Sequence, residues 1–277
     1  MKNLKNLRHL VLSLVLILFA ASCSSDDDAP APDDDPVTQT AKVKEIRRIM
    51  HDHDFVINGI ENALVFDYDT EGKISHITNK VVNENPAENY DDHYAITYNS
   101  DGTIQKIQYT DGFAGENATT NFGYSDGKLS SLTESGGTLD ISYNAAGNYF
   151  SYQFSSEFPV CSIYFNSNGN IAKYDDPFWG TKTLTTNSNE GVYVETPMNQ
   201  ELKIYLIMRS LDPSGYHNYF LTKELTKIET SGETIFGPIE GTVTTNIINV
   251  VRNSDGLIES YWHDGDGNVE MRITYVE

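Results

Sequence analysis

A short motif that recurs along the chain is the feature that most constrains its fold. Each copy has an aromatic residue, usually followed by Asn or Asp, then a Gly, and an apolar residue two positions after that Gly. Asn and Asp hydrogen-bond to nearby backbone and start a tight turn, and Gly tolerates the positive φ that closes it. Because Tyr, Ile and Thr flank these turns, each copy predicts a β-hairpin. The copies are Tyr68–Ile74, Tyr98–Ile104, Tyr124–Leu129, Tyr143–Tyr149, Phe165–Ile171 and Arg252–Ile258, the last with Arg in place of the aromatic residue.

The returning strand of the second copy departs from a simple alternation. Ile104 and Ile107 are three positions apart, which breaks the two-residue period of a strand. Either a β-bulge re-phases this strand, or both of its faces are partly covered.

Consecutive hairpins predict an all-β fold, an up-and-down antiparallel meander. A single sheet of well over ten strands tends to curl or close, because a flat sheet exposes both edges and an apolar face. We therefore expect a closed barrel or a strongly curved sheet, with the two ends of the folded part close together if it closes. The alternative is an open, single-layer stack of hairpins.

The first 22 residues read as a targeting segment. Lys2, Lys5 and Arg8 precede the apolar run 10–21, which is short for a membrane-spanning helix. Small residues directly before Cys23 resemble a bacterial lipobox, although Ala20 stands where Leu is usual. We expect lipid modification of Cys23, which would anchor the protein to a membrane. An ordinary signal peptide cleaved nearby is the alternative.

Residues 23–36 form an acidic tether, and residues 37–277 a single all-β domain. The tether is a run of Ser, Asp, Ala and Pro that cannot bury apolar surface. A cysteine followed by serines and an acidic run resembles the surface-export signal of Bacteroidota lipoproteins. We expect a lipid-anchored protein on the outer face of the outer membrane, with the periplasmic face as the alternative.

The net charge of the chain restricts the classes of molecule that it can bind. Loss of the three positive charges of residues 1–22 takes the net charge from −21 to −24 in the mature chain. Such acidity argues against nucleic acid as a partner. It is compatible with cations, neutral glycans or basic protein surfaces. Cys161 is the only cysteine besides Cys23, so we expect a buried thiol without an internal disulfide.

Several segments outside the repeats are read less directly. Residues 41–50 have apolar residues at helical spacing, yet a first strand is equally compatible with them. Residues 175–200 depart from the pattern, and a long loop is expected at Asp175–Gly180. Strands are expected at Leu202–Met208, Tyr216–Ile228, Leu257–His263 and Asn268–Tyr275.

Two groups of residues are candidates for ligand binding. Asp67, Asp69 and Glu71 open like a calcium loop, which would make Ca²⁺ the one cofactor to consider. Thr78 stands where the last carboxylate of such a loop belongs, so a plain turn is the favoured interpretation. Aromatic residues could stack against sugar rings, or could instead cap the barrel. They are Tyr174, Phe178, Trp179, Tyr261 and Trp262.

The repeated units resemble the YD repeats of RHS-type proteins. With the leader, the chain also resembles Bacteroidota lipoproteins that carry a domain of unknown function with a porin-like meander barrel. The resemblance covers roughly residues 60–175 and 240–277, and Ala146 and Arg252 depart from its motif. It implies a fold and a location, and it brings no established activity.

No nucleophile, phosphate-binding or His-Glu-x-x-His motif occurs in the sequence. We therefore expect a non-catalytic surface module that binds a glycan or a protein. The alternative is a glycan-acting hydrolase with paired carboxylates at the barrel mouth. A pore is not expected, because the long alternations that give a continuous lipid-facing apolar band are missing.

Overall fold

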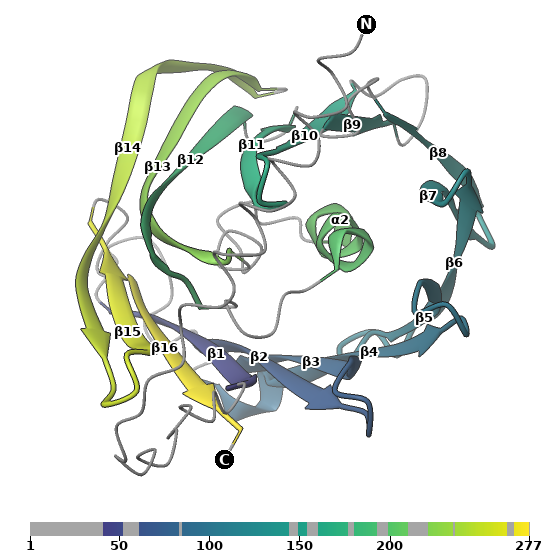
Figure 1. The fold of residues 1–277 in the computed structure, drawn as a ribbon, viewed down its shortest axis with the longest axis horizontal. Coiled ribbons are helices and arrows are strands. Elements are labelled where there is room, and N and C mark those ends of the chain that lie inside the picture. Colours follow the sequence, from purple (N-terminus) through teal and green to yellow (C-terminus); the bar gives the residue numbers. More distant parts are fainter. Residues whose placement is uncertain are drawn as a thin grey trace, which may run out of the picture. The chain divides into compact units, whose positions relative to one another are not determined.

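The computed structural model describes residues 41–51, 61–82, 85–143, 149–153, 160–176, 180–192, 199–209, 221–234, 236–264 and 269–276. All of them belong to one compact unit, Thr40–Glu277. In this unit every strand pairs antiparallel with the strands before and after it, and β1 pairs with β16, so the sheet closes into a barrel (Figure 1).

The described residues contain sixteen strands and two short helices. The first eight strands are β1 (Val43–Met50), β2 (Glu61–Tyr68), β3 (Ile74–Val82), β4 (Tyr90–Tyr98), β5 (Ile104–Thr110), β6 (Asn117–Ser125), β7 (Lys128–Glu134) and β8 (Gly137–Tyr143). The others are β9 (Tyr149–Tyr152), β10 (Cys161–Phe165), β11 (Ile171–Asp176), β12 (Gly180–Glu190), β13 (Lys223–Thr234), β14 (Gly237–Arg252), β15 (Ile258–His263) and β16 (Val269–Tyr275). The helices are the 3₁₀ turn η1 (Pro86–Glu88) and α2 (Gln200–Arg209).

Closure of the sheet decides the structure of the first segment. Strand β1 lies between β2 and β16, with Ile46 opposite both Leu64 and Ile273. Residues 43–50 are therefore a strand, and the helix that the spacing of their apolar residues also allowed does not form. The two ends of the barrel are neighbours, as expected for a closed meander.

A β-bulge follows the turn in five of the repeated hairpins. Opposite Tyr98 and Thr97 stand Ile104 and Lys106, which leaves Gln105 as the extra residue. Because this residue re-phases the strand, both Ile104 and Ile107 are fully buried. The prediction of a bulge is confirmed, and the same shift occurs in the other hairpins at Asp67/Tyr68, Gly123/Tyr124, Tyr164/Phe165 and Val251/Arg252.

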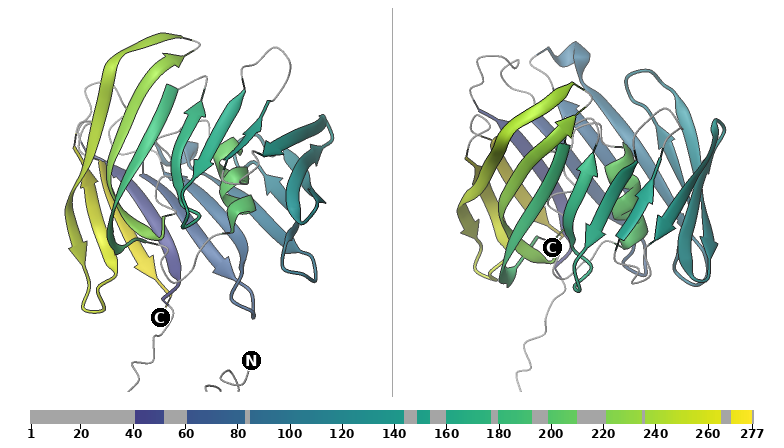
Figure 2. Two further views of the ribbon diagram at one scale, coloured as in Figure 1. Left: turned by 45° about the horizontal axis from the view of Figure 1, so that its top comes forward. Right: turned by 90° about the horizontal axis from the view of Figure 1, so that it is seen from above.

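The core lies inside the barrel and includes α2. Figure 1 shows this helix within the ring of strands, and both views of Figure 2 agree. Its residue Tyr205 is 1% exposed and packs edge-on against Tyr94 of β4, with ring centroids 6.3 Å apart. Phe122 of β6 contacts the same ring, at 5.8 Å.

The predicted strand at Leu202–Met208 is wrong, because this segment is the buried helix. Leu202, Ile204, Tyr205 and Ile207 are all buried. A helix surrounded on several sides loses the one-sided pattern that would reveal it, and a short apolar run then resembles a strand. The start signal was present, since the side chain of Asn199 accepts a hydrogen bond from the Leu202 amide at 2.8 Å.

Two further expectations need correction. The expected loop at Asp175–Gly180 is shorter, because Asp175 and Asp176 end β11 and Gly180 begins β12; residues 177–179 lie outside the described part. The expected strand Tyr216–Ile228 begins only at Lys223 and continues to Thr234, and residues 210–220 lie outside the described part. Cys161 is buried, in agreement with the expectation.

Candidate functional site

The structure separates the aromatic residues predicted to bind ligands. Tyr174 is 2% exposed and belongs to the core, and Tyr261 is also buried. Trp262, the next residue along β15, is partly exposed and points to the outer face. Phe178 and Trp179 lie outside the described residues. Of the described aromatic candidates, Trp262 alone is placed for contact with a ligand.

Trp262 lies on the outer face of the barrel beside His51. The two rings are stacked, with centroids 5.0 Å apart and planes at 22°. His51 also contacts the Glu270 carboxylate at 2.9 Å, and Arg272 donates to the same carboxylate at 2.7 Å. Hydrogen bonding by Arg272, followed by that of His51, lowers the pKa of Glu270 although burial opposes it. Ile248, directly opposite Trp262 on β14, is an exposed apolar side chain.

The Asp67–Glu71 segment has the geometry of a turn. One Asp69 carboxylate oxygen accepts the amides of Glu71 and Lys73, at 2.9 and 2.8 Å. The carboxylate of Glu71 pairs with the side chain of Lys73. Asn166 and Asn253 accept two amides in the same way in their own turns. Among the described residues no three His, Cys, Asp or Glu side chains gather as metal ligands.

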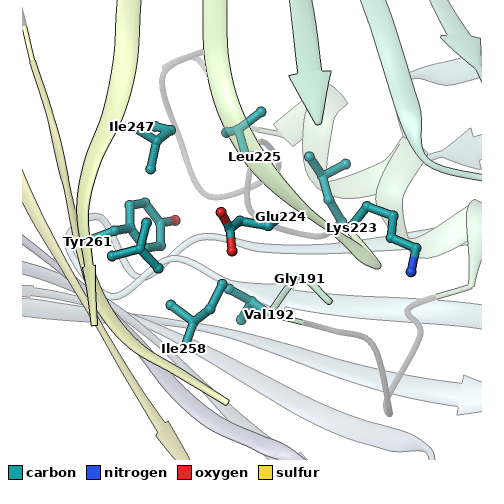
Figure 3. A pocket seen from close by; sticks show the side chains of 10 residues that line it. Gly191, Val192, Lys223, Glu224, Leu225, Ile247, Ile258 and Tyr261 are labelled. Carbon is teal, nitrogen blue, oxygen red and sulfur yellow. The ribbon is translucent and has the colours of Figure 1, made fainter. Parts of the chain in front are cut away.

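A small pocket opens where two neighbouring strands part. The β13–β14 ladder ends at Lys227 and Asn246. Beyond that point β14 pairs with β15, and Lys223 of β13 pairs with Glu190 of β12. The pocket lies in the gap (Figure 3) and encloses about 20 Å³, which is room for about one or two water molecules. Its apolar lining comes from Val192, Leu221, Leu225, Ile247, Ile258 and Tyr261.

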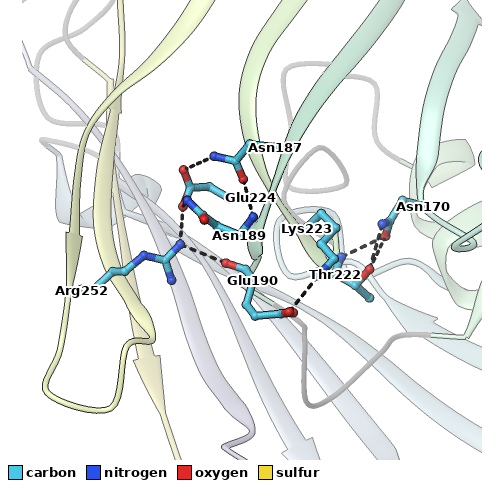
Figure 4. A network of polar contacts seen from close by, with 8 residues as sticks. All are labelled: Asn170, Asn187, Asn189, Glu190, Thr222, Lys223, Glu224 and Arg252. Carbon is cyan, nitrogen blue, oxygen red and sulfur yellow. Dashed lines mark hydrogen bonds and ion pairs between the residues drawn. The ribbon is translucent and has the colours of Figure 1, made fainter.

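A buried carboxylate at this pocket joins the parted strands. The Glu224 side chain is 11% exposed and forms an ion pair with Arg252 at the end of β14. It also accepts a hydrogen bond from Asn187 at 2.8 Å, as Figure 4 shows. Arg252 donates further to the Glu190 carbonyl at 3.0 Å. Side-chain bonds thus replace the missing ladder bonds between β13 and β14.

The sequence did contain a signal for this network. Arg252 occupies the position at which the other five copies of the repeat have an aromatic residue. An Arg in that position can reach across the gap and bring a positive charge to a buried carboxylate, which Tyr or Phe cannot do. This departure from the motif marks the place where the sheet splits. The pocket itself could not be predicted, because Glu224 and Val192 have no pattern of their own.

The fold is similar to that of a solved porin-like protein. A porin-like protein from Bacteroides uniformis is similar over 84% of this chain and 98% of its own, with a TM-score of 0.50 at 14% identity. A porin-like protein from Bacteroides vulgatus is similar over 85% and 99%, with a TM-score of 0.42 at 14% identity. No family model and no curated protein matches the sequence. Within the described residues, no helix is long and apolar enough to cross a membrane.

Proposed function

We propose that this protein is a non-catalytic binding module, anchored through a lipid on Cys23 and displayed on the cell surface. The observation that carries the proposal is the filled interior of the barrel. Helix α2 and a continuous apolar cluster from the strands around it occupy the inside. This arrangement supports the interpretation that the barrel is a rigid scaffold. Ligands would then bind at its outer surface or at its rims.

The outer face supports the same interpretation. A barrel that crosses a membrane turns an apolar band toward the lipid. The exposed positions of β5, β6 and β16 are polar here, as at Gln105, Gln108, Thr119, Asn121 and Arg272. Trp262, with the exposed Ile248 and Val251 nearby on β14, is an exception to this polarity. An aromatic ring beside Glu270 and Arg272 offers both stacking and hydrogen bonding, the combination that sugar recognition uses.

The buried carboxylates support a structural rather than a catalytic role. Asp92 accepts hydrogen bonds from Asn79 and from the amide of Gly112. Glu224 and Glu270 each have an arginine partner. A glycoside hydrolase needs a carboxylic acid that can donate a proton to the leaving group. The paired-carboxylate hydrolase stays the alternative, and hydrolysis of a bound glycan would favour it.

Binding is tested with a glycan array, probed with the wild-type protein and a Trp262→Ala variant, with and without Ca²⁺. We expect a specific glycan whose signal falls at least tenfold in the variant. The matched control is Tyr109→Ala on β5, another partly buried aromatic residue. Loss of signal in both variants, or no specific glycan at all, would contradict sugar binding at Trp262 and direct attention to protein ligands.

Anchoring is tested separately with Cys23→Ser. We expect the wild-type chain to fractionate with outer membranes and to be cleaved by protease added to intact cells. The variant should lose lipid labelling and the membrane association. A wild-type chain that is membrane-bound but protected from protease would place it on the periplasmic side instead.

A further inference from the structure

Two histidines lie side by side on the outer face of β3 and β4. Ile77 and Tyr94, which face each other across this strand pair, belong to the core or pack against it. Side chains alternate along a strand, so His76 and His93, each adjacent to one of these residues, point outward. Both are partly exposed, which leaves them accessible to a solute.

The distance between the two rings fits chelation. The Nε2 atom of His76 is 3.3 Å from the Nδ1 atom of His93, and the ring centroids are 5.4 Å apart. Two imidazole nitrogens on one tetrahedral Zn²⁺, each about 2.0–2.1 Å from the metal, are about 3.4 Å from each other. The two nitrogens share a hydrogen bond in this structure, and their separation matches that of two ligands of one ion.

A carboxylate on the neighbouring strand β2 is the candidate for a third ligand. Asp67 on β2 is the direct cross-strand partner of His76 and is exposed. Since no three ligand groups of the described part already gather, the carboxylate of Asp67 would turn toward the pair on binding.

We propose that His76 and His93 chelate a divalent transition metal of the Zn²⁺ type, with Asp67 as the third protein ligand. Water fills the remaining coordination position, as in an open zinc site. Imidazole ligands favour Zn²⁺, Cu²⁺ or Ni²⁺ over Ca²⁺, so this site differs in chemistry from the calcium loop considered at Asp69. The strongly acidic mature chain raises the local concentration of cations near its surface. The inference is independent of glycan binding.

The test is isothermal titration of the full chain with ZnCl₂, comparing the wild type with His93→Gln, His76→Gln and Asp67→Asn. We expect one site that weakens at least tenfold in either histidine variant and about threefold or more in Asp67→Asn. The matched control is His51→Gln, a partly exposed histidine directly after β1, which should titrate like the wild type. Thermal unfolding without metal verifies that the variants are folded.

Three results would overturn the proposal. The first is that the wild type does not bind Zn²⁺ at about 100 µM of metal. The second is that the His76→Gln/His93→Gln double variant binds Zn²⁺ as well as the wild type. The third is that the His51→Gln control loses as much Zn²⁺ affinity as the two single histidine variants. Unchanged binding by Asp67→Asn alone would remove that residue from the site. Titration with CaCl₂ should show no heat that depends on either histidine.

Discussion

The hydroxyl of Tyr98 donates a hydrogen bond to the backbone carbonyl of Ile74, at 2.8 Å, and so joins two consecutive hairpins. Each of these residues is a fixed position of the repeated motif, the aromatic residue before the turn and the apolar residue after it. The same bond links Tyr124 to Ile104 at 2.9 Å and Tyr275 to Ile258 at 2.9 Å. The repeat therefore specifies contacts between hairpins as well as turns within them.

Replacement of Tyr98 by Phe should destabilise the barrel by about 1 kcal/mol, because the carbonyl of Ile74 loses a buried partner. Burial raises the pKa of Tyr98 to about 12, so the bond persists through the neutral range. Urea unfolding measures the effect. The control is Tyr90→Phe, whose ring contacts Phe113 and whose hydroxyl makes no hydrogen bond to the described residues. Equal effects of the two changes would contradict a specific role for the bond.

A glycine at each repeated turn has a conformational reason. Gly102 has φ of +87°, and a Cβ there would meet only the end of the Lys73 side chain, at 3.8 Å. Gly102→Ala should therefore cost about 1 kcal/mol through backbone strain rather than collision. Gly136 also has open space around it, without a positive φ, so Gly136→Ala should be close to neutral. Thermal unfolding of both variants distinguishes strain from crowding.

The repeat made most of the wall of the barrel predictable. Tyr, Asn, Gly and Ile at fixed positions determine the turn and place the bulge, and consecutive hairpins then leave a meander as the simple topology. Closure could only be expected as one option, because it depends on the pairing of Ile46 with Ile273, residues 227 positions apart. No local pattern carries information about such a contact.

The interior and the candidate sites were much less predictable. Helix α2 is buried on several sides, which removes the periodicity that sequence reading relies on. Trp262 and Tyr174 are equivalent as sequence features, and only the register of their strands puts one outside and the other in the core. The split between β13 and β14 depends on Glu224 and Arg252, which are 28 positions apart.

Helix α2 should contribute strongly to stability through Tyr205. The ring is almost fully buried between Tyr94 and Phe122, so Tyr205→Ala leaves a cavity at the centre of the barrel. We expect a loss of about 3–5 kcal/mol in the free energy of unfolding. Leu206→Ala, at a partly buried position of the same helix, should cost clearly less. Similar losses in both would mean that α2 is not held through Tyr205.

Acid should destabilise the protein through His263. This residue is 6% exposed, and burial together with the charge of Arg48 lowers its pKa to about 4. Above pH 6.5 His263 is neutral in both the folded and the unfolded state, so its titration does not reduce the free energy of unfolding. As the pH falls toward 4, His263 becomes protonated in the unfolded state and stays neutral in the folded state. The free energy of unfolding therefore declines by about 3 kcal/mol.

The measurement is the free energy of unfolding of wild type and His263→Gln at several pH values. The difference between the two curves should change from pH 6.5 to 4 and be constant below 4, because other groups titrate in both proteins. Parallel curves would show that His263 takes up its proton equally in both states.

The pair of Glu224 and Arg252 should matter more than an exposed ion pair. Arg252→Met leaves the carboxylate of Glu224 buried with only amide partners, and we expect a loss of about 2–3 kcal/mol. Lys227→Met breaks a pair with Glu229 whose side chains are each about one-third exposed, and should cost under about 1 kcal/mol.

If the parted strands are held by the charge pair, the double variant Arg252→Met/Glu224→Gln should recover part of the loss, because it removes the unpaired charge. Urea unfolding of the wild type, Arg252→Met, Glu224→Gln and the double variant gives the coupling. Additive losses would instead mean that Arg252 acts through its bond to the Glu190 carbonyl, independently of Glu224.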